Sequence, residues 1–240
     1  MSLSPSTRVV VIGGTSGIGL AVAQAAAKAG AQVIVGSRSE QSVKRALSLL
    51  PGHADGLPVD VTSAVSLESF FAQVGAFDHL VYTAGDALVR GVITDYDPQQ
   101  AHDFFDIRLF RALDTVRRAL ATLHGSGSVT LTSGAAAFHG GTGKLLGSTV
   151  SAAVIAAARS LAAELAPLRV NVVAPGVVRT PLWSNMPEQA QKLLFDRAGG
   201  DTLLGRVADP EDVAKVYVSL MEQDYVTGNV AVVDGGSILK

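Results

Sequence analysis

The sequence predicts a single α/β domain with a doubly wound, mainly parallel sheet of about seven strands and helices on both faces. Short β-branched runs alternate with longer helical stretches, which is the pattern of successive βαβ units. The first run, residues 9–12, is apolar at every position, as is typical of a strand buried on both faces. The 240 residues contain no internal repeat, low-complexity tract or linker. We therefore expect residues 1–240 to form one domain.

Each expected element follows from a local pattern. Strands are expected at the short apolar runs, residues 9–12, 32–35, 57–59, 79–82, 128–132, 169–173 and 229–233. Helices are expected at the longer stretches between them, residues 20–29, 40–50, 63–73, 99–123 and 148–165, with one more opening at Pro210. Gly30 is suited to close the first helix, Ser63 to cap the third, and Pro210 to occupy the first turn of the last.

Composition excludes several classes of protein. With 48% hydrophobic residues and a net charge of −2, the chain is not an intrinsically disordered one. Lysine and arginine form no cluster, which argues against a nucleic-acid-binding face. There is no cysteine, so disulfides, thiolate nucleophiles and thiolate metal sites are excluded, and the histidines show no metal-ligand spacing. Neither a secretory signal nor a run of ~20 apolar residues is present, so we expect a cytoplasmic protein without a membrane span.

A glycine-rich turn between the first strand and the first helix predicts a nucleotide site. Residues 13–19 read Gly-Gly-Thr-Ser-Gly-Ile-Gly. Gly13 allows the tight turn, Gly17 lets the backbone approach a pyrophosphate, and Gly19 lets helix and strand pack closely. The helix N-terminus then faces the phosphates. We expect the cofactor to contact Thr15, Ser16 and Ile18 as well as the three glycines.

The spacing of these glycines, Gly-x3-Gly-x-Gly, is one of several landmarks that resemble the short-chain dehydrogenase/reductase family. The others follow in the family's order: Asp60-Val61, Thr83-Ala84-Gly85, Thr132-Ser133, the stretch 169–180, and the tail 226–236. This resemblance covers nearly the whole chain and implies a Rossmann domain. It further implies that the cofactor's adenine lies at Asp60 and Val61, with Ala84 and Gly85 nearby, and that the nicotinamide is held by Pro175, Gly176, Val178 and Thr180.

The end of the second strand indicates which nicotinamide cofactor is bound. An acidic residue there would bind the ribose 2′-hydroxyl of NAD, but this chain has Ser37 at that place and Arg38 directly after it. A guanidinium and hydroxyl groups suit a 2′-phosphate, so the sequence favours NADP(H). In the alternative interpretation Arg38 is only the solvated start of the second helix.

The catalytic positions depart from the family. The family's active site has a Tyr, a Lys four residues later, a Ser after the fifth strand and an Asn in the fourth helix. Ser133 matches the Ser, whereas Gly147 stands at the Tyr place, Ser151 at the Lys place and Arg108 at the Asn place. No tyrosine lies between Tyr96 and Tyr217, so a shifted alignment does not restore the acid.

Arg108 is our candidate for the missing electrophile. Small residues at the Tyr and Lys places leave space, into which a guanidinium can reach to stabilise a substrate oxyanion. Because arginine stays protonated, the proton would come from water, His139 or Lys144. The alternative is that Arg108 forms an ion pair with Asp103 or Asp106, or contacts another subunit.

Three functions stay open. The first is an NADP(H)-dependent oxidoreductase that reduces a carbonyl or C=N group, with Arg108, Ser133 and His139 at the site. The second is a non-redox cyclase or lyase, and the third a non-catalytic NADP(H)-binding regulator or subunit. The preserved nicotinamide end favours the reductase.

Two further segments bear on the substrate and on assembly. A substrate lid is expected at about residues 181–205, where apolar side chains either face a hydrophobic small-molecule substrate or pack among themselves: Trp183, Met186, Leu193 and Phe195. The alanine-rich helix 148–165 suits close packing against a second copy. The family commonly forms dimers or tetramers through this region, so we expect a homodimer or homotetramer. Tight packing within the monomer is the alternative.

Overall fold

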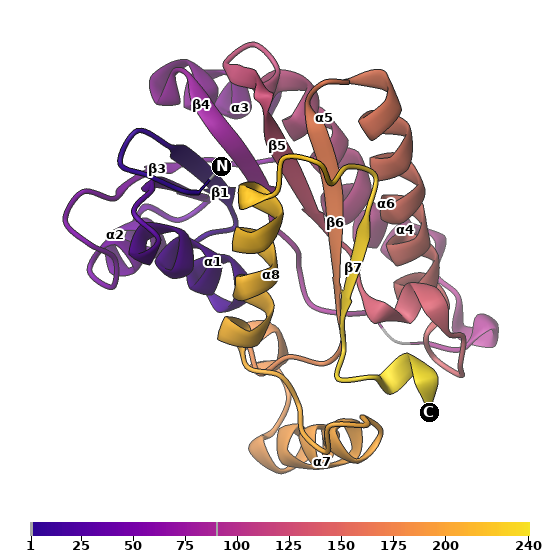
Figure 1. The fold of residues 1–240 in the computed structure, drawn as a ribbon. Helices are drawn as coiled ribbons and strands as arrows, with labels where there is room; N and C mark the ends of the chain where they lie inside the picture. The colour runs from indigo at the N-terminus through magenta and orange to yellow at the C-terminus, as the bar shows by residue number, and fades with distance from the viewer. Residues whose placement is uncertain (1, 90) are drawn as a thin grey trace.

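The computed structural model, which describes residues 2–89 and 91–240, contains a seven-stranded sheet with the order β3-β2-β1-β4-β5-β6-β7 (Figure 1). Every pairing in the sheet is parallel. Its strands are β1 (Arg8–Ile12), β2 (Gln32–Ser37), β3 (Asp55–Pro58), β4 (Phe77–Tyr82), β5 (Leu123–Thr132), β6 (Arg169–Pro175) and β7 (Val230–Val233). The strand order reverses between β1 and β4, so the predicted doubly wound α/β fold is confirmed.

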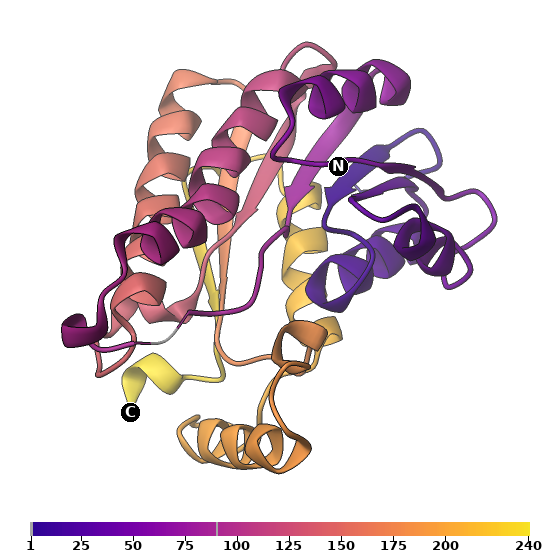
Figure 2. The same cartoon turned by 180° about the vertical axis from the view of Figure 1, so that it is seen from behind.

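Helices cover both faces of the sheet (Figures 1 and 2). One face packs against α1 (Gly17–Lys28), α2 (Glu40–Leu47) and α8 (Pro210–Glu222). The other packs against α3 (Ala64–Val74), α5 (Arg111–Ala119) and α6 (Leu145–Glu164). Two separate apolar cores result, one on each side of the sheet.

Strand β1 is apolar at residues 9–12 because both of its faces are buried. Val9 and Val11 belong to the core under α1 and α8, while Val10 and Ile12 belong to the core under α3 and α5. All four side chains are almost completely buried. Side chains alternate between the faces of a strand, so a strand covered on both faces needs apolar residues at every position.

Several expected caps are confirmed. The Ser63 side chain accepts a hydrogen bond from the backbone N–H of Ser66 at the start of α3. Pro210 lies in the first turn of α8, where Asp209 and Asp212 form a reciprocal capping box. These contacts satisfy backbone donors that the first turn of a helix leaves without partners.

The helix expected over residues 99–123 is wrong in two respects. It is divided into α4 (Pro98–Phe105), a π-helical turn at Asp106–Phe110, and α5 (Arg111–Ala119). In this π-turn the backbone N–H of Arg111 bonds to the carbonyl of Asp106, five residues back instead of four. Residues from Leu123 onward already belong to β5, which begins earlier than the expected 128 and has a register shift against β4.

The carboxyl ends of the strands lie at one edge of the sheet, and the segment after β6 crosses that edge (Figure 1). It contains a short 3₁₀ turn, Pro181–Trp183, and α7 (Glu188–Gly200). Both lie within the expected lid, residues 181–205.

Candidate active site

A cavity of about 940 Å³ opens at the carboxyl ends of the strands. Ligands of doubly wound sheets bind in this crevice, next to the point where the strand order reverses. The glycine loop, the loops after β2, β4, β5 and β6, the first turn of α6, and the lid all contribute to its wall.

The glycine loop has the geometry that its sequence predicts. Gly13 and Gly17 have φ angles of +84° and +51°, in the region that side chains rarely adopt. A Cβ atom at Gly19 would lie 2.3 Å from the carbonyl oxygen of Gly13 and 2.4 Å from Oγ1 of Thr83. Only glycine therefore allows α1 to start this close to β1. Thr15, Ser16 and Ile18, also expected at the site, line the cavity as well.

At the end of β2, Ser37 and Arg38 both line the cavity, together with Ser42 and Arg45 of α2, which sequence reasoning missed. The Arg38 guanidinium lies 3.6 Å from the Asp86 carboxylate, and both side chains are more than half exposed. Exposed ion pairs of this kind contribute little to stability, so Arg38 is free to take another anion.

Of the two residues expected at the adenine, Val61 lines the cavity and Asp60 does not. Val61 lines the cavity, with Val59 and Thr62 beside it. Asp60 is not part of the wall, because its carboxylate accepts hydrogen bonds from the backbone N–H and the hydroxyl of Thr62. Those bonds lower the pKa of Asp60 and fix the turn that carries the two valines.

The expected nicotinamide residues Pro175, Gly176, Val178 and Thr180 all line the cavity. A Cβ atom at Gly176 would lie 3.0 Å from Asp234, so the turn after β6 packs tightly on the end of β7. Ala84 and Gly85, after β4, line the opposite wall.

The lid contributes apolar atoms to the cavity. Leu182 and Trp183 line it, and the Trp183 indole N–H donates to the carbonyl of Val178 at 2.8 Å. Leu193 is instead exposed, and Phe195 lies under the Arg179 guanidinium. Of the four side chains expected on the inner face, only Trp183 lines the cavity.

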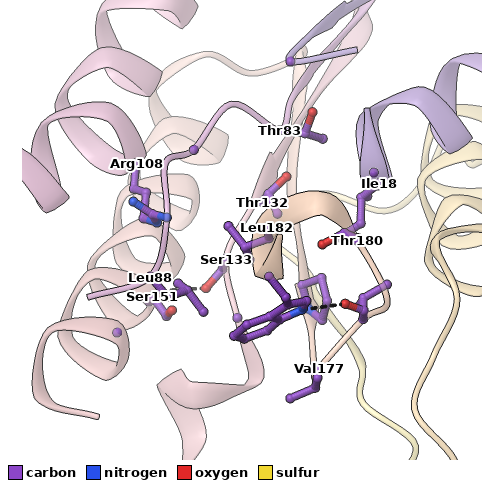
Figure 3. Close-up of a pocket in the computed structure, with 18 of the residues that line it drawn as sticks. Ile18, Thr83, Leu88, Arg108, Thr132, Ser133, Ser151, Val177, Thr180 and Leu182 are labelled. Atoms are coloured by element: carbon purple, nitrogen blue, oxygen red, sulfur yellow. Dashed lines mark hydrogen bonds between the residues drawn. The ribbon is translucent and has the colours of Figure 1, made fainter. Parts of the chain in front are cut away.

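Ser133, Gly147 and Ser151 lie on the same side of the cavity. The Ser133 hydroxyl donates to the backbone carbonyl of Ser151 at 2.8 Å, which fixes its orientation (Figure 3). A Cβ atom added at Gly147 would meet no described atom within 4 Å. The place where the family has its tyrosine is therefore open space.

Arg108 lines the same cavity from the π-turn, across from Ser133 and Leu182 (Figure 3). Its guanidinium lies over the Phe104 ring, 4.1 Å from the ring centroid, and Nη2 donates to the backbone carbonyl of Asp86. Nη1 is buried and makes no hydrogen bond to any described residue. Burial lowers the pKa of Arg108 to about 10, against the opposing effect of the Asp86 carboxylate, so the side chain is a cation at neutral pH.

The alternative ion pairs for Arg108 do not form. Asp106 binds the Nε of Arg111 at 2.9 Å. Asp103 accepts a hydrogen bond from Gln99 at 2.8 Å. Arg108 is thus a largely buried cation among the residues that line the cavity, and such a guanidinium has the chemistry of an oxyanion-binding group.

His139 and Lys144 both line the cavity. The Nδ1 of His139 lies 3.1 Å from the carbonyl of Ala135, so this nitrogen carries the proton and Nε2 is an acceptor in the neutral ring. Either side chain can relay a proton from solvent, and the choice between them stays a prediction.

Sequence reasoning missed Tyr82 and Phe104, which hold the π-turn and Arg108, whereas Asp86 was expected to offset the Arg108 charge and does lie beside it. The available signal was at Tyr82, which immediately precedes Thr83-Ala84-Gly85, where the family usually reads Asn-Asn-Ala-Gly. Within residues 2–89 and 91–240, no group of three or more acidic or histidine side chains is arranged to hold a metal ion.

These features define an α/β protein with the glycine loop and the cavity of a dinucleotide-binding fold. A family model described as enoyl-(acyl carrier protein) reductase matches residues 13–237. The short-chain dehydrogenase/reductase ucsE of Acremonium sp is 35% identical over 253 residues, covering 96% of this chain and 95% of that protein. The short-chain dehydrogenase/reductase malC of Malbranchea aurantiaca is 32% identical and covers 97% and 94%. The chain belongs to the short-chain dehydrogenase/reductase family, whose members are oxidoreductases.

Solved structures agree with this assignment. A small-chain dehydrogenase in complex with NADPH has a TM-score of 0.85 and 29% identity, covering 98% of this chain and 99% of that one. The MalC reductase/Diels-Alderase from Malbranchea aurantiaca has a TM-score of 0.91 and 28% identity, covering 99% and 98%. The predicted NADP(H) cofactor agrees with the NADPH bound by the first of these proteins.

Proposed function

We propose that this protein is an NADP(H)-dependent reductase of a carbonyl or C=N group in a small, hydrophobic molecule. The observation that carries the proposal is Arg108, a cavity-lining residue whose Nη1 has no hydrogen-bond partner among the described residues but is buried, so that a substrate would reach it after a small movement of the side chain. Arg108 and Gly147 both line this cavity. Leu88, Phe104, Leu182 and Trp183 add apolar surface, which suits a hydrophobic substrate.

The cofactor supplies a hydride, with both electrons, to the substrate carbon. As that bond forms, the π electrons of the C=O bond move to oxygen, and the guanidinium of Arg108 stabilises the negative charge by a charge-assisted hydrogen bond. The proton that completes the alcohol comes from water, with His139 and Lys144 as candidate relays. A cationic iminium would be repelled by Arg108, so the geometry favours carbonyl substrates.

Ser37 and Arg38 support NADPH over NADH, because no carboxylate stands at the end of β2 to bind a ribose 2′-hydroxyl. The NADPH complex of a structural relative points the same way. Small molecules are thus the proposed partners, and the cytoplasm, where NADPH is available, is the proposed location.

The test begins with NADPH binding, followed by a screen of ketones, aldehydes and imines for NADPH oxidation. Arg108→Ala is expected to lower kcat by about 10²–10³-fold, the usual cost of removing one oxyanion-binding donor, while NADPH binding is retained. Arg117→Ala, an exposed arginine on α5, is the matched control and should keep full activity. Full turnover by Arg108→Ala would remove Arg108 from the site, and binding without any turnover would favour the regulator.

A second candidate function is a non-redox cyclisation on the same scaffold. The name of MalC, a reductase/Diels-Alderase, is the observation that favours it. Substrate consumption at unchanged NADPH concentration would identify this activity, whereas a reductase consumes one NADPH per substrate.

A further inference from the structure

Tyr82, at the end of β4, makes a contact that the proposed reaction has not yet used. Its side chain is 2% exposed, and its hydroxyl donates to the backbone carbonyl of Ile107 at 2.7 Å. Ile107 lies inside the π-turn and directly precedes Arg108. One phenol on the sheet is therefore bonded to the segment of helix that carries the candidate electrophile.

The π-turn needs such an outside partner. An extra residue in a helix changes the backbone hydrogen bonds from four residues apart to five, and these turns are rare and frequently occur at functional sites. Here the N–H of Arg111 bonds to Asp106, and Tyr82 supplies a donor to the next carbonyl from outside the helix. Burial raises the pKa of Tyr82, so its hydroxyl stays protonated and can donate at any physiological pH.

The π-turn also sets the direction in which the Arg108 side chain points. Its guanidinium is held against the Phe104 ring from α4 and against the Asp86 carbonyl in the loop after β4. These two contacts occupy one face of the guanidinium and its Nη2. The other terminal nitrogen, Nη1, is buried and has no hydrogen-bond partner among the described residues. Without the additional residue of the π-turn, successive side chains would be rotated by about 100° per residue relative to this arrangement, and Arg108 would point elsewhere.

We propose that Tyr82 is a positioning residue, whose hydroxyl holds the π-turn so that the Arg108 guanidinium stays at the cavity, where it can bind the substrate oxygen. This inference rests on the proposed function in one respect, that Arg108 binds the reacting group. Tyr82 itself touches neither cofactor nor substrate, because its side chain lies in the core under α3 and α5. The phenol thus acts at a distance from the family's tyrosine position, through an arginine and without giving up its proton.

The decisive variant is Tyr82→Phe, which removes one hydroxyl and keeps the ring. Ser128→Ala is the matched control, since Ser128 is also buried, its hydroxyl lies 2.8 Å from Nδ1 of His79, and it is not among the residues that line the cavity. Both variants should lose a similar amount of stability, about 1 kcal/mol for one hydrogen bond. Only Tyr82→Phe should change the position of the π-turn and of Arg108.

The first arm is a crystal structure of Tyr82→Phe with NADPH, and it requires no substrate. We expect Arg108 to leave the Asp86 carbonyl and the π-turn to relax to an α-helix. An unchanged turn with Arg108 in place would overturn the inference, whatever the enzyme's activity is. This arm therefore separates a failure of the inference from a failure of the proposed function.

The second arm is kinetic and uses a carbonyl substrate from the screen. Misplacement of a reacting group by ~1 Å costs up to ~10²-fold, so Tyr82→Phe should lower kcat by about 10–10²-fold with unchanged NADPH affinity. In the Arg108→Ala background the same substitution should have no further effect on kcat. Equal losses in both backgrounds would show a merely structural role and reject the inference.

Discussion

At the scale of single residues, the site lacks the tyrosine that the family has on α6 and has an arginine, Arg108, on the π-turn instead. Glycine at 147 removes the phenol and leaves open space, and Arg108 lines the same cavity from the π-turn. The exchange changes the chemistry, because a buried guanidinium stabilises negative charge but keeps its proton at neutral pH. The proton that completes an alcohol product would therefore come from solvent, directly or through a relaying side chain.

Gly147 gives a direct test of the open space. Gly147→Ala should keep activity and raise stability by up to ~1 kcal/mol, because alanine favours helices and its Cβ meets no described atom within 4 Å. Gly147→Phe should fill the substrate space, so kcat/KM should fall steeply while NADPH affinity is retained. The checks are thermal unfolding and steady-state kinetics. Normal kinetics for Gly147→Phe would show that the substrate lies elsewhere.

Arg38 gives the corresponding test at the other end of the cofactor. A hydrogen bond to a charged group contributes roughly 1.5–3 kcal/mol, so Arg38→Ala should weaken NADPH binding by about 10–10²-fold. NADH lacks the 2′-phosphate and serves as the internal control, with an unchanged dissociation constant. Fluorescence titration of both cofactors measures the difference. Equal losses for NADPH and NADH would contradict the assignment of Arg38 to the phosphate.

At the scale of elements, the sequence predicted the strands and most of the helices, but it missed α7 and the division of the helix after β4. The strands, the glycine loop and the caps at Ser63 and Pro210 follow from local patterns and are present. The π-turn at Asp106–Phe110 could not be predicted, because one extra residue in a helix leaves no mark on composition. Its partner Tyr82 is 25 residues away in sequence, and the contact exists only in the folded chain.

A row of polar residues across three strands provides a pH prediction at this scale. His79, Ser128 and Arg169 are paired in register on β4, β5 and β6, and all three are buried. His79 Nδ1 lies 2.8 Å from the Ser128 hydroxyl. Burial, with the nearby Arg169 charge, lowers the pKa of His79 from its usual 6.5 to about 4. The folded protein therefore keeps this ring neutral in mildly acidic solution.

The sign of the effect follows from proton linkage. Below pH 6.5 the unfolded chain protonates His79 but the folded protein does not until about pH 4, so stability falls across this window as pH decreases. Urea unfolding should show a loss of about 2 kcal/mol between pH 7 and pH 5 from this group. His79→Gln should remove that part of the pH dependence, whereas His124→Gln, on the surface, should retain it. An unchanged slope in His79→Gln would contradict the assignment.

At the scale of the whole molecule, α6 has an exposed side on which small side chains prevail. By length and composition α6 is the one helix of the described residues that could span a membrane, yet only a third of its apolar window is buried. Its exposed positions recur with helical spacing, and most carry small or apolar side chains (Leu145, Thr149, Ala152, Ala156 and Ala163), while Arg159, Ser160 and Glu164 near its C-terminus are polar. The neighbouring π-turn adds Phe110, which is 47% exposed. Small side chains let a second helix approach closely, which favours a copy of the same chain as the cover.

We therefore predict that the protein is a homodimer or homotetramer with α6 at a symmetric interface. A twofold axis would place α6 against its own copy, so a charge at Ala156 would meet itself across the interface and be desolvated there. Ala156→Arg should accordingly shift the mass measured by light scattering after size exclusion to that of a smaller assembly. Val65→Arg, on the exposed face of α3, is the matched control and should leave the mass unchanged. A monomer for the wild-type chain at micromolar concentration would reject the prediction. Loss of assembly without loss of NADPH binding would show that the cofactor site is complete within one chain.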